Sequence, residues 1–235
     1  MSPEAKRVAG LVDLTLLNLS AEPEALYELG RQGELAQVAA FCIYPKHLPL
    51  LNAPNTIRRA TVLNFPAGTD SIDDTHKALH HIIHHNLAQE IDYVFPYTRY
   101  LAGETTQALA DATSIIQACH THHLTIKIIL ETESFPDDDT LFTLCLKLIE
   151  QGCDFLKTST GTKPIGATPE AVKTILEAIQ HSEQSTCGLK VSGGVKTLES
   201  ALFYMELAEK TLGREVNANG FRLGASSLVS QLLKT

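Results

Sequence analysis

The sequence contains no tryptophan, few aromatic residues (6%) and no uninterrupted apolar run near the roughly 18 residues that a membrane-spanning helix needs. Its first ten residues, MSPEAKRVAG, lack the apolar centre of an export signal. Basic tracts are also absent, and 19 Lys and Arg residues against 27 Asp and Glu residues give a formal net charge of −8. An acidic surface repels the phosphate backbone of nucleic acids. We therefore expect a cytoplasmic protein without a membrane or nucleic-acid partner.

Cysteine is scarce and lacks the CxxC spacing of structural zinc sites. The five cysteines are odd in number and widely spaced, which favours reduced thiols over a disulfide framework. With 44% hydrophobic and 20% charged residues, the composition is that of an ordinary globular protein. The 235 residues suit one or two domains, and α/β barrels commonly occupy about 200–250 residues as a single domain.

Short apolar runs of strand length alternate with amphipathic segments of helical period. The candidate strands are residues 10–14, 38–44, 59–65, 90–95, 125–130, 154–159, 188–193 and 220–225. The clearest helices between them are predicted at residues 105–120, 139–151, 169–181 and 197–212. Eight apolar strands separated by helices predict a single-domain α/β protein, residues 1–235, folded as a closed (β/α)8 TIM barrel. A doubly wound open sheet is the alternative, because it is built from the same βαβ units.

Charged and polar residues interrupt the predicted strands, several of them near the carboxyl ends where a barrel carries its catalytic groups. They are Asp13, Cys42, Asn64, Asp92, Lys127, Lys157, Lys190 and Arg222. An isolated buried charge is costly, so these side chains need partners, which a shared barrel mouth supplies.

Lys157 and Lys190 stand out because each lies in an apolar strand just before small, loop-forming residues. An ordinary lysine is almost entirely protonated at pH 7, but a neighbouring ammonium and partial desolvation bring the pKa of such a lysine to about 7–8. The neutral amine then attacks a carbonyl and forms a Schiff base. Asp92 is suited to carry protons to a carbonyl or hydroxyl through water. The alternative is that both lysines form structural ion pairs with Asp13, Asp92 or Glu131.

Glycine-bearing segments follow three of the strands: STGT at 159–162, SGGV at 192–195 and GASS at 224–227. Successive backbone N–H groups in such loops bind phosphate, and the phosphate sites of barrels commonly follow the seventh and eighth strands. Serine and lysine side chains lie beside these glycines. Each loop taken alone is also explained as a tight turn between a strand and a helix.

Histidines cluster in the segment HKALHHIIHHN at residues 76–86. Histidines spaced by four residues share a helical face and can bind a metal, but the apolar stripe of Leu79, Ile82 and Ile83 places them mainly on the solvent side. We therefore expect a solvated helix face and no metal site. Cys42 has two interpretations: an exposed thiol at a strand end that traps aldehydes, or a small core residue.

Seven segments carry a more specific pattern. They are DLTLLN at 13–18, FCIYP at 41–45, TVLNFPAG at 61–68, EIDYVFPY at 90–97, DFLKTSTG at 154–161, GLKVSGGV at 188–195 and FRLGASSL at 221–228. In this order, over about nine tenths of the chain, they resemble the deoxyribose-phosphate aldolase family. The resemblance implies a class I aldolase of deoxyribonucleoside catabolism. Such an enzyme reversibly cleaves 2-deoxy-D-ribose 5-phosphate to D-glyceraldehyde 3-phosphate and acetaldehyde, without a metal or other cofactor.

The resemblance also assigns roles to individual residues. Lys157 would form the Schiff base, Lys190 would be the neighbour that favours its neutral form, and Asp92 would relay protons. The substrate and its phosphate would be bound by Gly161, Thr162, Gly193, Gly194, Lys196, Gly224, Ser226 and Ser227. Cys42, Asp13 and Asn18 match further pocket positions, with Cys42 at the cysteine associated with aldehyde sensitivity in some members. The expected partners are sugar phosphates and aldehydes, and the expected assembly is a monomer or a homodimer.

The segment after KTSTG departs from the family pattern. Many members have a lysine there, whereas Thr162 takes that place and the lysine follows as Lys163, ahead of Pro164. Because proline stiffens the loop, we expect Lys163 to point elsewhere, with weaker binding of the phosphate or an altered substrate selectivity as the result. Two other functions stay open: a barrel that binds sugar phosphates without turnover, and a metal-dependent lyase that uses the histidines.

Overall fold

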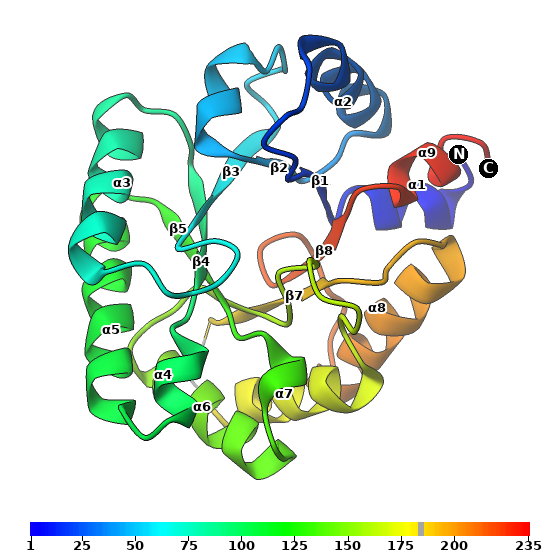
Figure 1. Cartoon of the computed structure of the whole chain (residues 1–235). Coiled ribbons are helices and arrows are strands. Elements are labelled where there is room, and N and C mark those ends of the chain that lie inside the picture. The colour runs from blue at the N-terminus through cyan, green and yellow to red at the C-terminus, as the bar shows by residue number, and fades with distance from the viewer. Residues whose placement is uncertain (183–185) are drawn as a thin grey trace.

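Eight parallel strands close into a barrel in the computed structural model, which describes residues 1–182 and 186–235 (Figure 1). The strands are β1 Val12–Leu16, β2 Ala40–Ile43, β3 Arg58–Leu63, β4 Glu90–Val94, β5 Thr125–Ile129, β6 Phe155–Lys157, β7 Gly188–Ser192 and β8 Phe221–Ala225. Each strand pairs with the next, and β8 pairs with β1, where Gly224 lies opposite Asp13. This closure confirms the predicted (β/α)8 TIM barrel, and the open-sheet alternative is wrong.

Helices surround the barrel and connect its strands (Figure 1). They are α1 Pro3–Ala9, α2 Pro23–Ala36, α3 Ile72–His84, α4 Tyr97–Leu101, α5 Thr105–Thr121, α6 Asp138–Glu150, α7 Pro169–His181, α8 Leu198–Leu212 and α9 Leu228–Leu232, with short 3-10 helices η1 Pro45–Leu50 and η2 Thr132–Ser134. The two chain ends lie close together, because α1 packs against α9 and α8 (Figure 1). Within the described residues, every helix is too short or too polar to cross a membrane.

The eight predicted strands are confirmed in number and order, and their ends differ from the prediction by up to two residues. The first strand was expected at residues 10–14, but it begins at Val12, because the preceding residues form α1. The Ser2 hydroxyl caps the start of that helix, and the Gly10 N–H bonds to the carbonyl of Lys6 at its end. The four predicted helices are confirmed to within one residue at each end. Helix α7 starts at the predicted cap, since the Thr168 hydroxyl accepts a hydrogen bond from the Ala171 N–H at 3.2 Å.

Apolar side chains fill two regions of different size. The large core lies between the strands and the surrounding helices. A second, small cluster is formed by Ala40, Cys42, Ala60 and Val62 on β2 and β3. Charged side chains from β1 and from β4 to β8 contact one another, which places them in the barrel interior. The interior is therefore apolar on one side and ionised on the other.

Candidate active site at the carboxyl end of the barrel

Asp92 joins three lysines that come from three neighbouring strands. Its Oδ2 atom accepts hydrogen bonds from Lys157 Nζ at 2.8 Å and from Lys190 Nζ at 2.7 Å. Its Oδ1 atom accepts one from Lys127 Nζ at 3.1 Å. All four side chains are buried. Because Lys157 and Lys190 contact the same oxygen, their two nitrogens are held close together, as the sequence predicted.

Two more carboxylates and an arginine complete this buried network. Asp13 contacts Lys190 and Arg222, each at 2.6 Å, and Lys127 at 3.3 Å. Glu90 contacts Lys127 at 2.5 Å and Arg222 at 3.0 Å. We call these seven residues the network: Asp13, Glu90, Asp92, Lys127, Lys157, Lys190 and Arg222. The predicted ion pairs are therefore present: Lys190 pairs with Asp13 and Asp92, and Lys157 pairs with Asp92. They occur together with the close approach of the two lysine nitrogens.

The network members differ in how well their charges are matched. Lys157 contacts one carboxylate, whereas Lys190 and Arg222 contact two each and Lys127 contacts three. Glu131, the third proposed partner of the lysines, is buried but bonds to the Thr160 hydroxyl at 2.6 Å instead. Lys157 is therefore the least compensated cation of the network.

The pKa values of the network follow from burial and ion pairing together. Burial alone raises the pKa of Asp92, but attraction by Lys127, Lys157 and Lys190 outweighs it and holds that pKa well below its usual range. Burial alone lowers the pKa of Lys190, and the carboxylates of Asp13 and Asp92 reverse this and raise it. At neutral pH, Asp92 is a carboxylate and Lys190 is an ammonium group beside Lys157.

Cys42 lies inside the barrel next to the network. Its side chain is fully buried, and Sγ lies 3.8 Å from Asp92 Oδ2. Burial raises the pKa of the thiol. The interpretation of Cys42 as an exposed thiol is therefore wrong, and it is a core residue, because its strand position faces the barrel interior and not the loops above.

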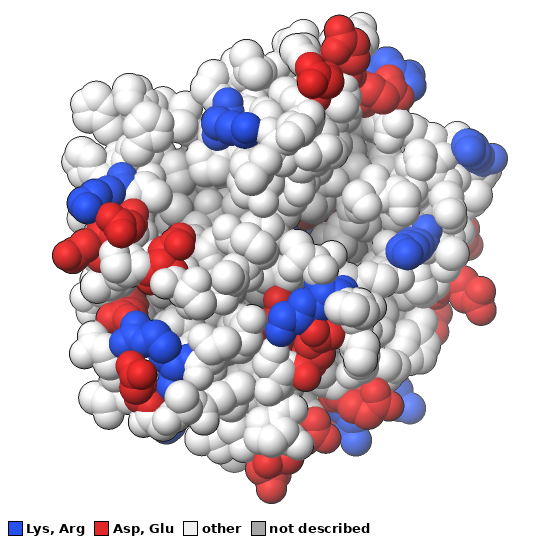
Figure 2. All heavy atoms as spheres, viewed as in Figure 1, with Lys and Arg blue, Asp and Glu red and all other residues white. Residues whose placement is uncertain are grey.

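A cavity of about 340 Å³ opens at the carboxyl ends of β1, β6, β7 and β8. Figure 2 shows a hollow near the middle of this face, surrounded mostly by uncharged side chains. The cavity is lined by Thr15, Leu16, Leu17, Asn18, Thr160, Gly161, Thr162, Ser192, Gly193, Gly194, Val195, Lys196, Gly224, Ala225 and Ser226. It borders the network, since a Cβ placed on Gly224 would lie 3.2 Å from Lys190 Cε.

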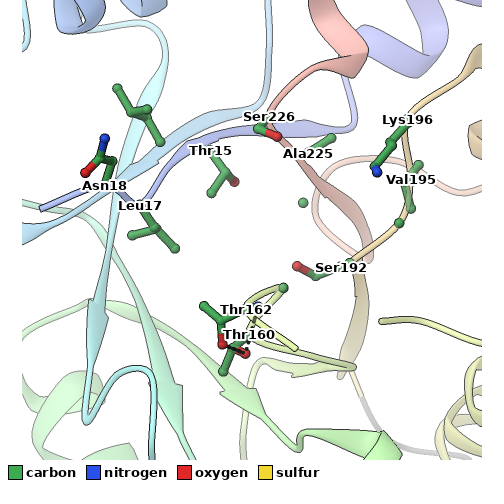
Figure 3. A pocket seen from close by; sticks show the side chains of 15 residues that line it. Thr15, Leu17, Asn18, Thr160, Thr162, Ser192, Val195, Lys196, Ala225 and Ser226 are labelled. Atoms are coloured by element: carbon green, nitrogen blue, oxygen red, sulfur yellow. Dashed lines mark hydrogen bonds between the residues drawn. The ribbon is translucent and has the colours of Figure 1, made fainter. Parts of the chain in front are cut away.

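Most of the predicted binding residues meet at this cavity. Eight of them line it: Asn18, Gly161, Thr162, Gly193, Gly194, Lys196, Gly224 and Ser226. Figure 3 shows Thr15, Thr162 and Ser192 around an open space, with Lys196 and Asn18 on opposite sides. Ser227 does not line the cavity, and Asp13 and Cys42 are buried beneath the strand ends. The sequence analysis assigned no role to Thr15, Leu16 or Leu17, because an ordinary strand end has the same pattern.

Lys163 points away from the cavity, as its position ahead of Pro164 predicted. Its Nζ bonds to Ser134 Oγ at 2.8 Å, lies 3.7 Å from Glu133 and stacks 4.9 Å above the Tyr97 ring. At the position where many family members have a lysine, the Thr162 hydroxyl bonds to the Thr160 hydroxyl at 2.8 Å (Figure 3). Among the described residues that line the cavity, only Lys196 is charged.

Two of the glycine loops approach each other at Gly166 and Gly193. A Cβ on Gly166 would lie 2.4 Å from the Gly193 backbone, and Gly193 has a φ of +89°, which disfavours any other residue. The Ala167 N–H donates to the Gly193 carbonyl at 3.0 Å. This contact places the loops after β6 and β7 on one wall of the cavity, and no motif in the sequence pointed to Gly166.

The histidine segment lies away from this site. His80, His81 and His84 are exposed on α3, as predicted, and so is His85 at its C-cap, whereas His76 bonds to Ser114. In the part of the chain that the structure describes, no three His, Cys, Asp or Glu residues are arranged to hold a metal ion.

The comparison with known families decides the class of this protein. A family model described as DeoC/LacD family aldolase matches residues 8–228. The chain belongs to this family. It is therefore an aldolase, a carbon–carbon lyase on a TIM barrel, and the resemblance inferred from its motifs is confirmed.

Solved structures of similar aldolases agree with this assignment. A candidate deoxyribose-phosphate aldolase from Coccidioides immitis is 27% identical with a TM-score of 0.83, and the match covers 100% of this aldolase and 87% of that chain. The aldolase QR15 is 25% identical with a TM-score of 0.81, over 97% and 96% of the two chains. The deoxyribose phosphate aldolase from Aeropyrum pernix, described as tetrameric, shares the fold at 22% identity, with a TM-score of 0.78 over 98% and 91%.

Proposed function

We propose that this aldolase reversibly cleaves 2-deoxy-D-ribose 5-phosphate to D-glyceraldehyde 3-phosphate and acetaldehyde, through a Schiff base on Lys157. One observation carries the proposal: Lys157 contacts one carboxylate and shares it with Lys190, which borders a cavity lined by glycine loops. A lysine next to a permanent ammonium group gives up its proton more readily, which supplies the neutral amine that attacks a carbonyl.

The chemistry begins at the aldehyde of the open-chain sugar. Neutral Lys157 attacks C1, and loss of water leaves an iminium ion. The C3 hydroxyl then loses its proton and the C2–C3 bond breaks, so that its electrons flow into the iminium and form an enamine. Glyceraldehyde 3-phosphate leaves as C3 to C5 of the sugar. Protonation of the enamine at C2 and hydrolysis of the imine release acetaldehyde and regenerate Lys157.

Asp92 and Lys190 are suited to manage the protons and charges of these steps. The Asp92 carboxylate lies 2.8 Å from the nucleophile, so it can orient Lys157 and pass protons through a water molecule. Lys190 stays charged beside Lys157, and a neighbouring positive charge favours the neutral form of an amine. The same arrangement disfavours the alternative of a binding-only barrel, because a site that only bound sugar phosphates would not need a buried lysine pair.

The glycine loops are suited to hold the phosphate at the far end of the substrate. Backbone N–H groups of such loops bind anions, and the Ser226 hydroxyl and the Lys196 ammonium add donors on the same cavity wall. The cavity volume of about 340 Å³ is in the range of small-molecule sites. Holding the phosphate fixes C1 near Lys157 and so favours reaction over diffusion. A monomeric or homodimeric assembly in the cytoplasm stays a prediction.

Reductive trapping tests the proposed nucleophile. The protein is treated with acetaldehyde and borohydride, and the product is examined by intact mass and peptide mapping. We expect one ethyl group on Lys157 and none in Lys157→Leu. Lys163→Met is the matched control, since its ammonium faces Ser134, and it should be labelled like the parent. Absence of the adduct, or its spread over surface lysines, would reject the Schiff base and favour the binding-only barrel.

A further inference from the structure

The network in the barrel contains more cations than carboxylates. Lys127, Lys157, Lys190 and Arg222 face Asp13, Glu90 and Asp92, and all seven side chains are almost fully buried. When every member is ionised, one positive charge in these seven residues has no counter-charge. Loss of the proton from Lys157 removes that excess. A buried net charge is costly, so the network favours the neutral form of its least compensated member.

Glu90 and Arg222 belong to this network but lie away from the substrate. They line a smaller cavity at the other end of the barrel, together with Arg58 and Asp154, and neither lines the cavity beside Lys157. Glu90 is the first residue of β4, two residues before Asp92, and it bonds to Lys127, which also bonds to Asp92. Arg222 reaches the site through Asp13, which contacts Lys190.

We propose that Glu90 and Arg222 are positioning residues that set the proton equilibrium of Lys157 from the opposite end of the barrel. The inference rests on the proposed function of Lys157. It extends the control of the nucleophile beyond Lys190 and Asp92 to two residues that touch no substrate. The mechanism is electrostatic: in a buried site, charges act over about 10 Å with little screening by salt.

Other charged or titratable groups face Lys157 from the surrounding strands. Asp92 contacts it directly, and Lys190 and Lys127 share that carboxylate from β7 and β5. Asp13 lies behind them on β1. Cys42 on β2 and Glu131 after β5 complete the surroundings: burial keeps Cys42 a thiol by raising its pKa, and Glu131 is bonded to Thr160. Glu90→Gln and Arg222→Gln leave all of these groups in place.

The test measures how fast Lys157 is trapped by acetaldehyde and cyanoborohydride as a function of pH. Acetaldehyde has no titratable group in this range, so the acid limb of the profile belongs to the protein. Glu90→Gln removes a negative charge and should move the limb to lower pH by on the order of one unit. Arg222→Gln removes a positive charge and should move it to higher pH by a similar amount. The double variant restores the charge balance, so its limb should return close to that of the parent.

Arg222→Lys is the matched control, because it keeps the charge and loses the two-pronged hydrogen bonding of arginine. A merely structural role predicts slower trapping in every variant, the control included, with an unmoved limb. Circular dichroism checks that each variant is folded. If a glutamine variant is not, Lys127→Met removes a cation from the network in its place and should also move the acid limb to higher pH. The inference is overturned if the acid limb does not move in either variant, or if it moves in the same direction in Glu90→Gln and in Arg222→Gln. A parent that is never labelled at Lys157 rejects the proposed function instead.

Discussion

Asp92 is a single residue on which three lysines converge, and this sharing distinguishes the site from a set of ordinary ion pairs. A carboxylate that bridges two lysine nitrogens holds them close together on one oxygen atom. The low pKa of Asp92 keeps it charged throughout the neutral range. The geometry of Lys157 and the positive field around it therefore depend on this one side chain.

Asp92→Asn tests that dependence. Asparagine keeps the shape but loses the charge, so we expect kcat/KM for aldol cleavage to fall by about 10²–10⁴-fold. The free energy of unfolding should also fall by about 3–5 kcal/mol, because buried cations lose their counter-charge. Steady-state kinetics and urea unfolding measure the two effects.

A matched control for this variant is Asp111→Asn. Asp111 is also a buried aspartate and pairs with Arg99 at 2.8 Å, but it lies on α5, outside the barrel. The Asp111→Asn protein should have a lower free energy of unfolding and an unchanged kcat. An Asp92→Asn protein with parental activity, or equal losses of activity in both variants, would contradict the assigned role.

At the scale of elements, the cavity is formed by the loops that follow β1, β6, β7 and β8. The strands and most helices were predictable, because apolar runs of strand length and helical periods are local signals. Lys157, Lys190 and Asp92 were predictable for a related reason: a charge inside an apolar run needs a function or a partner. The contact of Gly166 with Gly193 and the capture of Lys163 by Ser134 were not predictable as contacts, because each joins segments about 30 residues apart.

The loop after β6 leads to a prediction about the phosphate. Lys163 is held by Ser134 and Glu133, and Thr162 bonds to Thr160, so this loop places no cation in the cavity. Thr162→Lys adds one, and a charge-assisted hydrogen bond should lower KM for 2-deoxy-D-ribose 5-phosphate by about tenfold. The KM for unphosphorylated 2-deoxyribose should not change. Steady-state kinetics with both sugars measures this difference.

Lys163→Met serves as the control for the loop. Since its ammonium faces Ser134 and not the cavity, we expect an unchanged KM for the phosphorylated sugar. If Thr162→Lys leaves KM for the phosphorylated sugar unchanged, the cavity wall at residue 162 does not contact the phosphate. If Lys163→Met raises it, Lys163 reaches the substrate by a movement of the loop.

For the whole molecule, charge is distributed unevenly between the surface and the interior. The chain has a net charge of −8, yet the buried network has a surplus of cations. Closure of the barrel brings together residues that are up to 209 positions apart in the sequence, such as Asp13 and Arg222. The unfolded chain has no such network, so the ionisation of these groups is coupled to folding.

This coupling predicts how stability depends on pH. Asp13 and Asp92 have pKa values below those of an unfolded chain, so their stabilising effect is complete above the unfolded value near 3.8 and is lost as the pH falls below it. Lys127 and Lys190 have raised pKa values, so their effect is complete below the unfolded value near 10.5 and is lost as the pH rises above it. We expect a plateau in the free energy of unfolding between these limits.

Urea unfolding at a series of pH values measures the profile. On the acid side, each depressed carboxylate should contribute a slope of up to about 1.4 kcal/mol per pH unit. Glu177→Gln is the control, since Glu177 forms an exposed ion pair with Lys173, and such pairs add little to stability. Its profile should keep the acid slope of the parent, whereas Asp13→Asn should lower the plateau and flatten that slope. A parent whose unfolding free energy stays constant from pH 5 down to pH 3 would show that the carboxylates of the network do not have depressed pKa values in the folded barrel, and the electrostatic account of Lys157 would fail with it.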